Sequence, residues 1–174
     1  MAILFSELPL DRLGWQQTAD SYWAAVMTKD EDAASLDSKA PHETLAAYMA
    51  THFIVSTKPP ITLLIGDYSS LLASMLGASS AGAAFITAYN PKGVLLSDPE
   101  NTERHRMLIA DLTEQGYEFI EGEGVDPHGE WPGEISVLVL DIDRASAERL
   151  GARYDQNAIV WIDTDAIPRL LVLR

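Results

Sequence analysis

The stretch Ile135-Ser136-Val137-Leu138-Val139-Leu140-Asp141-Ile142 decides the fold, because apolar residues occupy both alternating sets of its positions. Successive residues of a strand face opposite sides of a sheet, so apolar residues on both faces require cover on both sides, or on one side and partly on the other. This stretch therefore predicts a central strand in the interior of a sheet.

Strand-like and helix-like patterns alternate before this strand. Phe85–Tyr89 predicts a strand. Ser97-Asp98-Pro99 then offers a helix cap and an early proline for a helix through Gln115, which Gly116 closes. Tyr117–Ile120 predicts a short strand before the central one.

The same alternation continues after the central strand. Asp143 predicts the cap of a second helix, in which Ala147, Leu150, Gly151 and Tyr154 share one face at helical spacing. Two more strands are predicted to follow, at Ala158–Ile162 and Leu170–Leu173. Near the start of the domain, a short helix over 42–50 is predicted to lead into a hairpin formed by residues 52–57 and 61–65, which the turn Lys58-Pro59-Pro60 separates.

From residue 85 to residue 162 the predicted order is strand, helix, strand, strand, helix, strand, which is the ferredoxin-like βαββαβ order. We therefore predict an α+β fold with an antiparallel sheet, both helices on one face, and the first and third of these strands in its centre. Residues 1–40, with a helical pattern over 10–27, are predicted to be a helical extension and linker. Residues 41–174 are predicted to be a single α+β domain, with a C-terminal added strand.

Composition limits the possible functions. The 174 residues carry a formal net charge of -14 and include no cysteine. This charge repels polyanions, so direct binding of nucleic acid is not expected. The lack of cysteine excludes disulfides, thiolate catalysis and cysteine-bound metals, and it favours the cytoplasm.

No membrane segment is expected. Residues 68–91 contain no charged side chain, but their many serine and glycine residues predict a buried helix and strand instead of a membrane span. The apolar opening over residues 1–5 lacks a basic region, so we expect no signal peptide.

The predicted topology gathers polar residues from separate segments at one edge of the sheet. These eight candidate site residues are Asn90 at the end of the first strand, Asn101 and Arg104 on the first helix, Asp126, Trp131 and Glu134 in the segment over 122–134, and Gln156 and Asn157 before the last strand of the core. An arginine near a helix N-terminus suits a carboxylate or phosphate. The alternative is that Arg104 pairs with a neighbouring acid while its stem covers the core.

The segment Gly122–Glu134 is predicted to be an unusually long connection between two hairpin strands. Asp126 and His128 could both face a hard cation, but their spacing matches no metal signature, and no metal site is assigned. Trp131 is predicted either to pack the loop onto the sheet or to stack on a ligand. Glu134 is the candidate general acid or base.

Familiar catalytic and cofactor patterns are missing from the sequence. It contains no phosphate loop and no Rossmann fingerprint, and Gly77–Gly82 is one residue too long for the G-x-S-x-G turn of hydrolases. The residues therefore leave open which cofactor is used, if any, and whether the protein is an enzyme.

The second half of the chain resembles a bacterial family of unknown function, numbered 3293. The resemblance rests on residues 85–91, on Ser97 with Glu100, Asn101 and Arg104, on Gly122, Gly124, Asp126 and Pro127, on Trp131, Pro132 and Glu134, and on residues 156–160. It extends over roughly residues 45–174 and weakens before Phe85. It implies a bacterial cytoplasmic origin and supplies these motifs, but it implies no reaction.

Three functions are compatible with these residues. The first is a pocket at the sheet edge for a small polar ligand with an anionic group, held by Arg104 and the helix N-terminus, with Asn90, Asn101, Gln156 and Asn157 recognising its amide or hydroxyl groups. The second is an acidic interaction module that docks on a basic protein, as a mimic of nucleic acid. The third is a purely structural polar network. Polar groups directed into a cleft would favour the first, whereas carboxylates spread over an exposed face would favour the second.

Overall fold

A computed structural model describes residues 47–77, 81–129 and 131–173 of the chain. The chain divides into two units, Met1–Asp37 and Ser38–Arg174, and the described residues all belong to the second. The helical extension and linker predicted over residues 1–40, with its boundary, lies outside the described residues. Of the helix predicted over 42–50, residues 47–50 are described and are helical.

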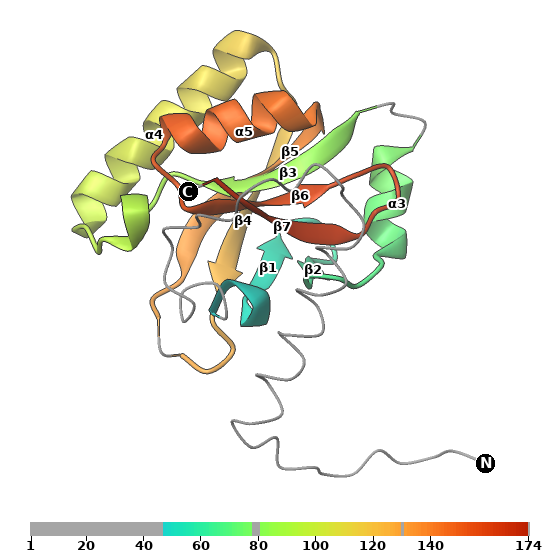
Figure 1. The fold of residues 1–174 in the computed structure, drawn as a ribbon, viewed down its shortest axis with the longest axis horizontal. Coiled ribbons are helices and arrows are strands. Elements are labelled where there is room, and N and C mark those ends of the chain that lie inside the picture. Colours follow the sequence, from blue (N-terminus) through green and yellow to red (C-terminus); the bar gives the residue numbers. More distant parts are fainter. Residues whose placement is uncertain (1–46, 78–80, 130, 174) are drawn as a thin grey trace. The chain divides into compact units, whose positions relative to one another are not determined.

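Seven antiparallel strands form one curled sheet, a half-barrel, with helices packed against it (Figure 1). The elements in chain order are β1 (His52–Val55), β2 (Ile61–Leu63), α3 (Ser70–Leu76), β3 (Gly82–Thr87), the short helix η1 (Pro91–Gly93), α4 (Asp98–Gln115), β4 (Phe119–Val125), β5 (Glu134–Ile142), α5 (Arg144–Arg153), β6 (Ala158–Ile162) and β7 (Pro168–Val172). The spatial order of the strands is β2-β1-β4-β5-β3-β6-β7.

The predicted mixture of helices and antiparallel sheet is confirmed, as is the interior position of β5 between β4 and β3. The predicted hairpin is present as the pair β1 and β2, and the added C-terminal strand is β7, which pairs with β6. The ferredoxin-like core stays a prediction, because the strands β3 to β6 are part of a larger curled sheet and do not stand alone.

The loop predicted over 122–134 is shorter in the structure, because β4 continues to Val125 and pairs with β1. Glycine usually weakens a strand, which is why this segment looked like a connection in the sequence. A Cβ atom on Gly122 would lie 2.6 Å from the Ile54 carbonyl oxygen and 2.7 Å from the Phe85 ring. Glycine is therefore required at 122 by close packing inside the sheet.

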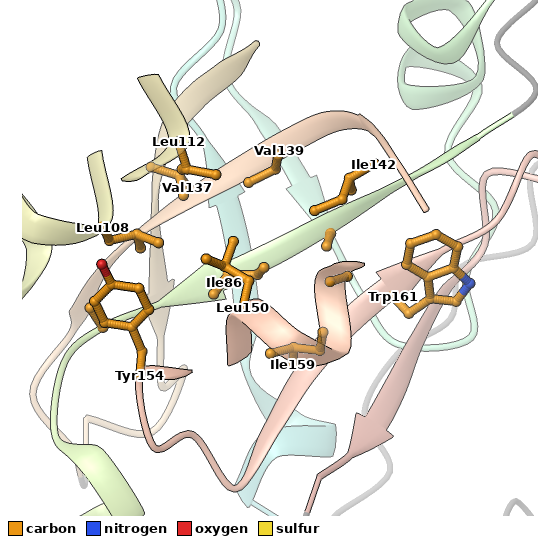
Figure 2. Close-up of a cluster of buried hydrophobic side chains, with 13 residues drawn as sticks. Ile86, Leu108, Leu112, Val137, Val139, Ile142, Leu150, Tyr154, Ile159 and Trp161 are labelled. Atoms are coloured by element: carbon orange, nitrogen blue, oxygen red, sulfur yellow. The ribbon is translucent and has the colours of Figure 1, made fainter. Parts of the chain in front are cut away.

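Helices α4 and α5 cover one face of the sheet, as predicted, and enclose the larger hydrophobic core (Figure 2). Leu108 and Leu112 from α4 and Leu150 from α5 meet Val137 and Val139 of β5. Apolar side chains of these helices and of the sheet are buried, among them Leu108, Leu112, Val137, Val139, Leu150 and Val160.

Both helices begin at the caps predicted from the sequence, and α4 also ends at the predicted glycine. The Glu100 carboxylate accepts a hydrogen bond from the Ser97 backbone N–H at 3.1 Å at the start of α4, and Gly116 ends that helix in the left-handed conformation. Asp143 caps α5 by accepting from the Ser146 N–H at 2.9 Å. These caps fix the direction in which each helix leaves the sheet.

On the opposite face, α3 fills one end of the half-barrel. Leu72 and Leu76 of α3 pack with Leu63 and Ile162 in a second hydrophobic cluster. At this end the Gly66 N–H donates to the Pro168 carbonyl at 2.8 Å, which links the segment after β2 to the first residue of β7. The other end of the same face is hollow, and the candidate site lies there. No helix among the described residues is long and apolar enough to cross a membrane.

Candidate functional site

A cavity of about 440 Å³ occupies the hollow end of the half-barrel, opposite the end that α3 fills. Its size is in the range of small-molecule sites in proteins. Its floor is formed by residues of the inner strands and its rim by the residues before β1 and by the loops after β3, β4 and α5. The aromatic lining residues are Tyr48, Phe53, Phe85 and Trp131, and the polar or charged ones are Thr51, Thr87, Asn90, Lys92, Asp126, Glu134, Ser136, Gln156 and Asn157.

Asn90 organises the inner end of this cavity. It follows β3 with a φ of 46°, a left-handed conformation that asparagine adopts more readily than most residues. Its backbone N–H donates to Asn101 Oδ1 at 2.9 Å, and its Oδ1 accepts from Asn101 Nδ2 at 2.9 Å and from the Leu96 N–H at 3.0 Å. Its Nδ2 donates to Glu134 Oε1 at 2.7 Å. The Asn90 side chain is thus locked by three partners and holds the Glu134 carboxyl group in place.

Glu134 is the principal ionisable group at this end of the cavity. Burial raises the pKa of its carboxyl group, and the hydrogen bond from Asn90 opposes that rise only in part. Oε1 accepts from Asn90, whereas Oε2 has no hydrogen-bond partner among the described residues. The carboxyl group is therefore oriented on one side and available to the cavity on the other.

Tyr48 and Asn157 form a second polar pair in the cavity. The Asn157 side chain hydrogen-bonds the Tyr48 hydroxyl group, and this contact moderates a Tyr48 pKa that burial raises. The negative charge of Glu134 raises that pKa further. A hydroxyl, an amide and a carboxyl group from residues 48, 157 and 134 thus share the cavity.

Arg104 is not among the residues that line the cavity. Its Nε donates to the Ala88 carbonyl at 2.8 Å and its terminal amine to the Tyr154 carbonyl at 2.6 Å. The guanidinium group therefore joins the end of β3 to the end of α5, instead of pairing with an acid as in the alternative considered above. Asn101 is 5% exposed and lies behind the cavity wall, where its side chain hydrogen-bonds Asn90.

Gln156 lines the cavity and also joins two segments of its rim. It borders the cavity, and its Nε2 donates to the Tyr89 carbonyl at 3.0 Å and to the Tyr154 carbonyl at 3.3 Å. Because these bonds bind the segment after β3 to the segment after α5, Gln156 helps to hold the rim in one arrangement.

The loop between β4 and β5 forms another part of the rim. The Asp126 carboxylate accepts from the His128 N–H at 2.9 Å and from the Trp131 N–H at 3.3 Å, which folds the loop back on itself. The Trp131 side chain is 56% exposed at the cavity mouth, so it is not a buried packing anchor. Within the described ranges, no group of three or more His, Cys, Asp or Glu residues is arranged to hold a metal ion.

The structure brings together six of the eight predicted site residues at the cavity, namely Asn90, Asp126, Trp131, Glu134, Gln156 and Asn157. Asn101 and Arg104 lie behind its wall. Tyr48, Phe53, Phe85 and Lys92 also line the cavity and were not predicted as site residues from the sequence. Of these four, Phe85 and Lys92 lie close in sequence to a predicted site residue. The sequence alone does not show whether an aromatic residue in a strand lines a cavity or packs in the core.

The polar residues of the cavity coincide with a region that other proteins share. Residues 86–159 match the family described as "Protein of unknown function (DUF3293)". The DUF3293 match is shorter than the resemblance inferred from the sequence, but it includes all eight predicted site residues. Tyr48 and Phe53 lie outside it. Searches of curated proteins and of solved structures found no match.

Proposed function

We propose that this protein binds a small polar ligand in the cavity at the hollow end of the half-barrel. The observation that carries the proposal is the Glu134 carboxyl group, which Asn90 orients on one side while its second oxygen stays available to the cavity. A purely structural network pairs its polar atoms with one another, as Asn101 and Arg104 do here. Polar groups directed into an apolar-walled cavity are typical of a binding site.

The residues that line the cavity would each contact a different part of the ligand. Asn157 and Tyr48 recognise hydroxyl or amide groups of the ligand, and Glu134 is the acid or base if a reaction takes place. An anionic group of the ligand would lie at Lys92 on the rim, because the guanidinium of Arg104 is bonded to two carbonyl groups. The Lys92 ammonium group lies 3.4 Å from the Asp155 carboxylate, so an anion there would compete with Asp155.

A thermal-shift screen with a variant that fills the cavity tests the proposal. The screen would include nucleotides, amino acids, amines, sugar phosphates and divalent ions. The variant Gly124→Val is suited to it, because a Cβ at 124 has only Thr51 Cγ2 within 4 Å, at 3.6 Å, and Gly124 lines the cavity. A ligand that stabilises the parent but not the folded Gly124→Val protein supports the proposal. Equal stabilisation of both proteins, or no stabilising compound in the screen, would contradict it.

Two further expectations belong to the same proposal. We propose that residues 85–162 are a ferredoxin-like unit extended by β1, β2 and β7, which the antiparallel order β4-β5-β3-β6 supports. We also propose a cytoplasmic bacterial setting, which the absence of cysteine supports. Docking of the acidic surface on a basic protein remains the alternative function. It predicts binding that Gly124→Val leaves unchanged.

A further inference from the structure

We propose that the end of the cavity at Glu134 takes the ammonium group of a small amine, with the apolar body of that amine packed against Phe53 and Phe85. This inference rests on the proposed function, since it names the class of ligand for the same cavity. It follows from the carboxylate, the aromatic walls and the charge of the lining.

The Glu134 carboxylate is the group that would bind the ammonium. The single bond from Asn90 Nδ2 leaves Oε2 of Glu134 able to accept a further hydrogen bond. A buried carboxylate is stabilised most by a donor that also carries positive charge, because such bonds are shorter and stronger than neutral ones. An ammonium group supplies both the charge and the donors.

The aromatic walls of the cavity suit the apolar body of an amine. The rings of Phe53 and Phe85 pack edge to face, with centroids 5.4 Å apart and an interplanar angle of 68°. Both rings line the cavity, together with Tyr48 and Trp131. Aromatic walls provide apolar area for the body of a ligand, and the faces of aromatic rings attract cations. The rings of Phe53 and Phe85 offer no hydrogen-bond donor to replace the water molecules that an anion would lose on entering the cavity.

The charged side chains that line the cavity favour a cation at its inner end. Among the described lining residues, the charged side chains are Glu134, Asp126 and Lys92. Lys92 lies on the rim, and its ammonium group is already close to the Asp155 carboxylate. Lys92 is the cationic side chain among the described lining residues, so an anion at the inner end would face the Glu134 carboxylate, whereas an ammonium group there would neutralise it. An anionic group on the same ligand fits only at the Lys92 side.

The experiment compares three probes that share a phenylethyl body and differ in the terminal group. They are phenethylammonium, phenethyl alcohol and hydrocinnamate, titrated into the full chain at neutral pH with ligand-observed NMR or calorimetry. We expect phenethylammonium to bind at least about tenfold more tightly than the alcohol, and hydrocinnamate to bind more weakly than either. Equal or tighter binding of the alcohol or the carboxylate, or no binding of any probe, would overturn the inference.

Glu134→Gln provides the decisive variant, because it keeps the shape of the side chain and an oxygen that can accept from Asn90. We expect it to remove the preference for the amine and to leave binding of the alcohol unchanged. Glu114→Gln, an exposed substitution on α4 with the same change of charge, is the matched control and should keep the preference. An amine preference that persists in Glu134→Gln would overturn the inference.

The pH dependence offers an independent readout. As the pH rises and Glu134 ionises, affinity for phenethylammonium should increase, while affinity for the alcohol should not change in parallel. Tyr48, Asp126 and Lys92 are the other ionisable groups that line the cavity in the described residues, so the profile is compared with that of Glu134→Gln. Parallel profiles for the two probes would contradict the inference. Failure of the inference is distinct from failure of the proposed function, because an anionic or neutral ligand that Gly124→Val excludes would leave the function standing.

Discussion

Gly122 and Gly124 lie two residues apart on β4, and they form a matched pair for testing why the sheet contains glycine. A Cβ atom on Gly122 would lie 2.6 Å from the Ile54 carbonyl oxygen and 2.7 Å from Cε2 of Phe85. Ordinary carbon–oxygen contacts begin near roughly 3.3 Å and carbon–carbon contacts near roughly 3.5 Å, so each contact would be too short by about 0.7 Å. At Gly124 the nearest atom is Thr51 Cγ2 at 3.6 Å, an ordinary contact.

The Phe85 ring is buried against Phe53, and the Ile54 carbonyl is held in the pairing of β1 with β4. Part of the strain in Gly122→Ala therefore cannot relax. Overpacking of this kind costs about 1–3 kcal/mol, and we expect the upper half of that range. Gly124→Ala should change the free energy of unfolding by less than about 0.5 kcal/mol, because the added Cβ makes only an ordinary contact with Thr51 and alanine restricts the unfolded chain.

Urea denaturation of the parent and both variants measures the difference. With a dependence of about 1–3 kcal/mol per molar urea, Gly122→Ala should lower the midpoint by roughly 1 M or more, while the Gly124→Ala midpoint stays near that of the parent. Equal midpoints for the two variants would refute the argument that close backbone contact, and not turn formation, requires glycine at 122.

Four further predictions concern the network around the cavity and the core. Arg104→Met should lower the free energy of unfolding by about 1.5–3 kcal/mol, because the carbonyls of Ala88 and Tyr154 lose a charged donor; an unchanged urea midpoint would contradict this role. The effects of Arg104→Met and Glu134→Gln should be additive in a double-mutant cycle, since Glu134 is bonded to Asn90 and Arg104 to two backbone carbonyls, and strong coupling between the two substitutions would contradict these separate roles. Because the pKa of Glu134 is raised in the folded state, its contribution to stability is complete at acidic pH and is lost as the pH rises through that pKa; Glu134→Gln should therefore gain stability relative to the parent between acidic and neutral pH, and a constant difference across this range would refute the assignment. Leu108→Ala should cost about 2–5 kcal/mol in chemical denaturation, because the side chain is fully buried, and a cost below about 1 kcal/mol would show that the site collapses around the missing atoms.

The helices and most strands were predictable, because their signals are local. The cap at Ser97, the left-handed Gly116 and the cap at Asp143 act within a few residues of their own positions. The apolar faces of residues 135–142 follow from the alternation of side chains in a strand, and they required cover on both sides. Six of the eight predicted site residues border the cavity for a related reason, since they lie where predicted strands and helices end.

Other features depended on neighbours that are distant in the chain. The glycines at 122 and 124 suggested a loop, yet the approach of β1 and the Phe85 ring makes the first of them part of a strand. An arginine near a helix N-terminus suggested an anion site, but Arg104 donates to the carbonyl groups of Ala88 and Tyr154 and does not line the cavity.

The amino-acid sequence was sufficient to predict the order of the strands and of the two long helices after residue 85, and the central place of β5. Periodicity and capping are properties of neighbouring residues, so they can be recognised without the rest of the chain. Only the tertiary structure decided where the cavity lies and what lines it. In the folded protein Tyr48 hydrogen-bonds Asn157 and Glu134 lines the same cavity, and such contacts depend on packing between segments that no local pattern specifies.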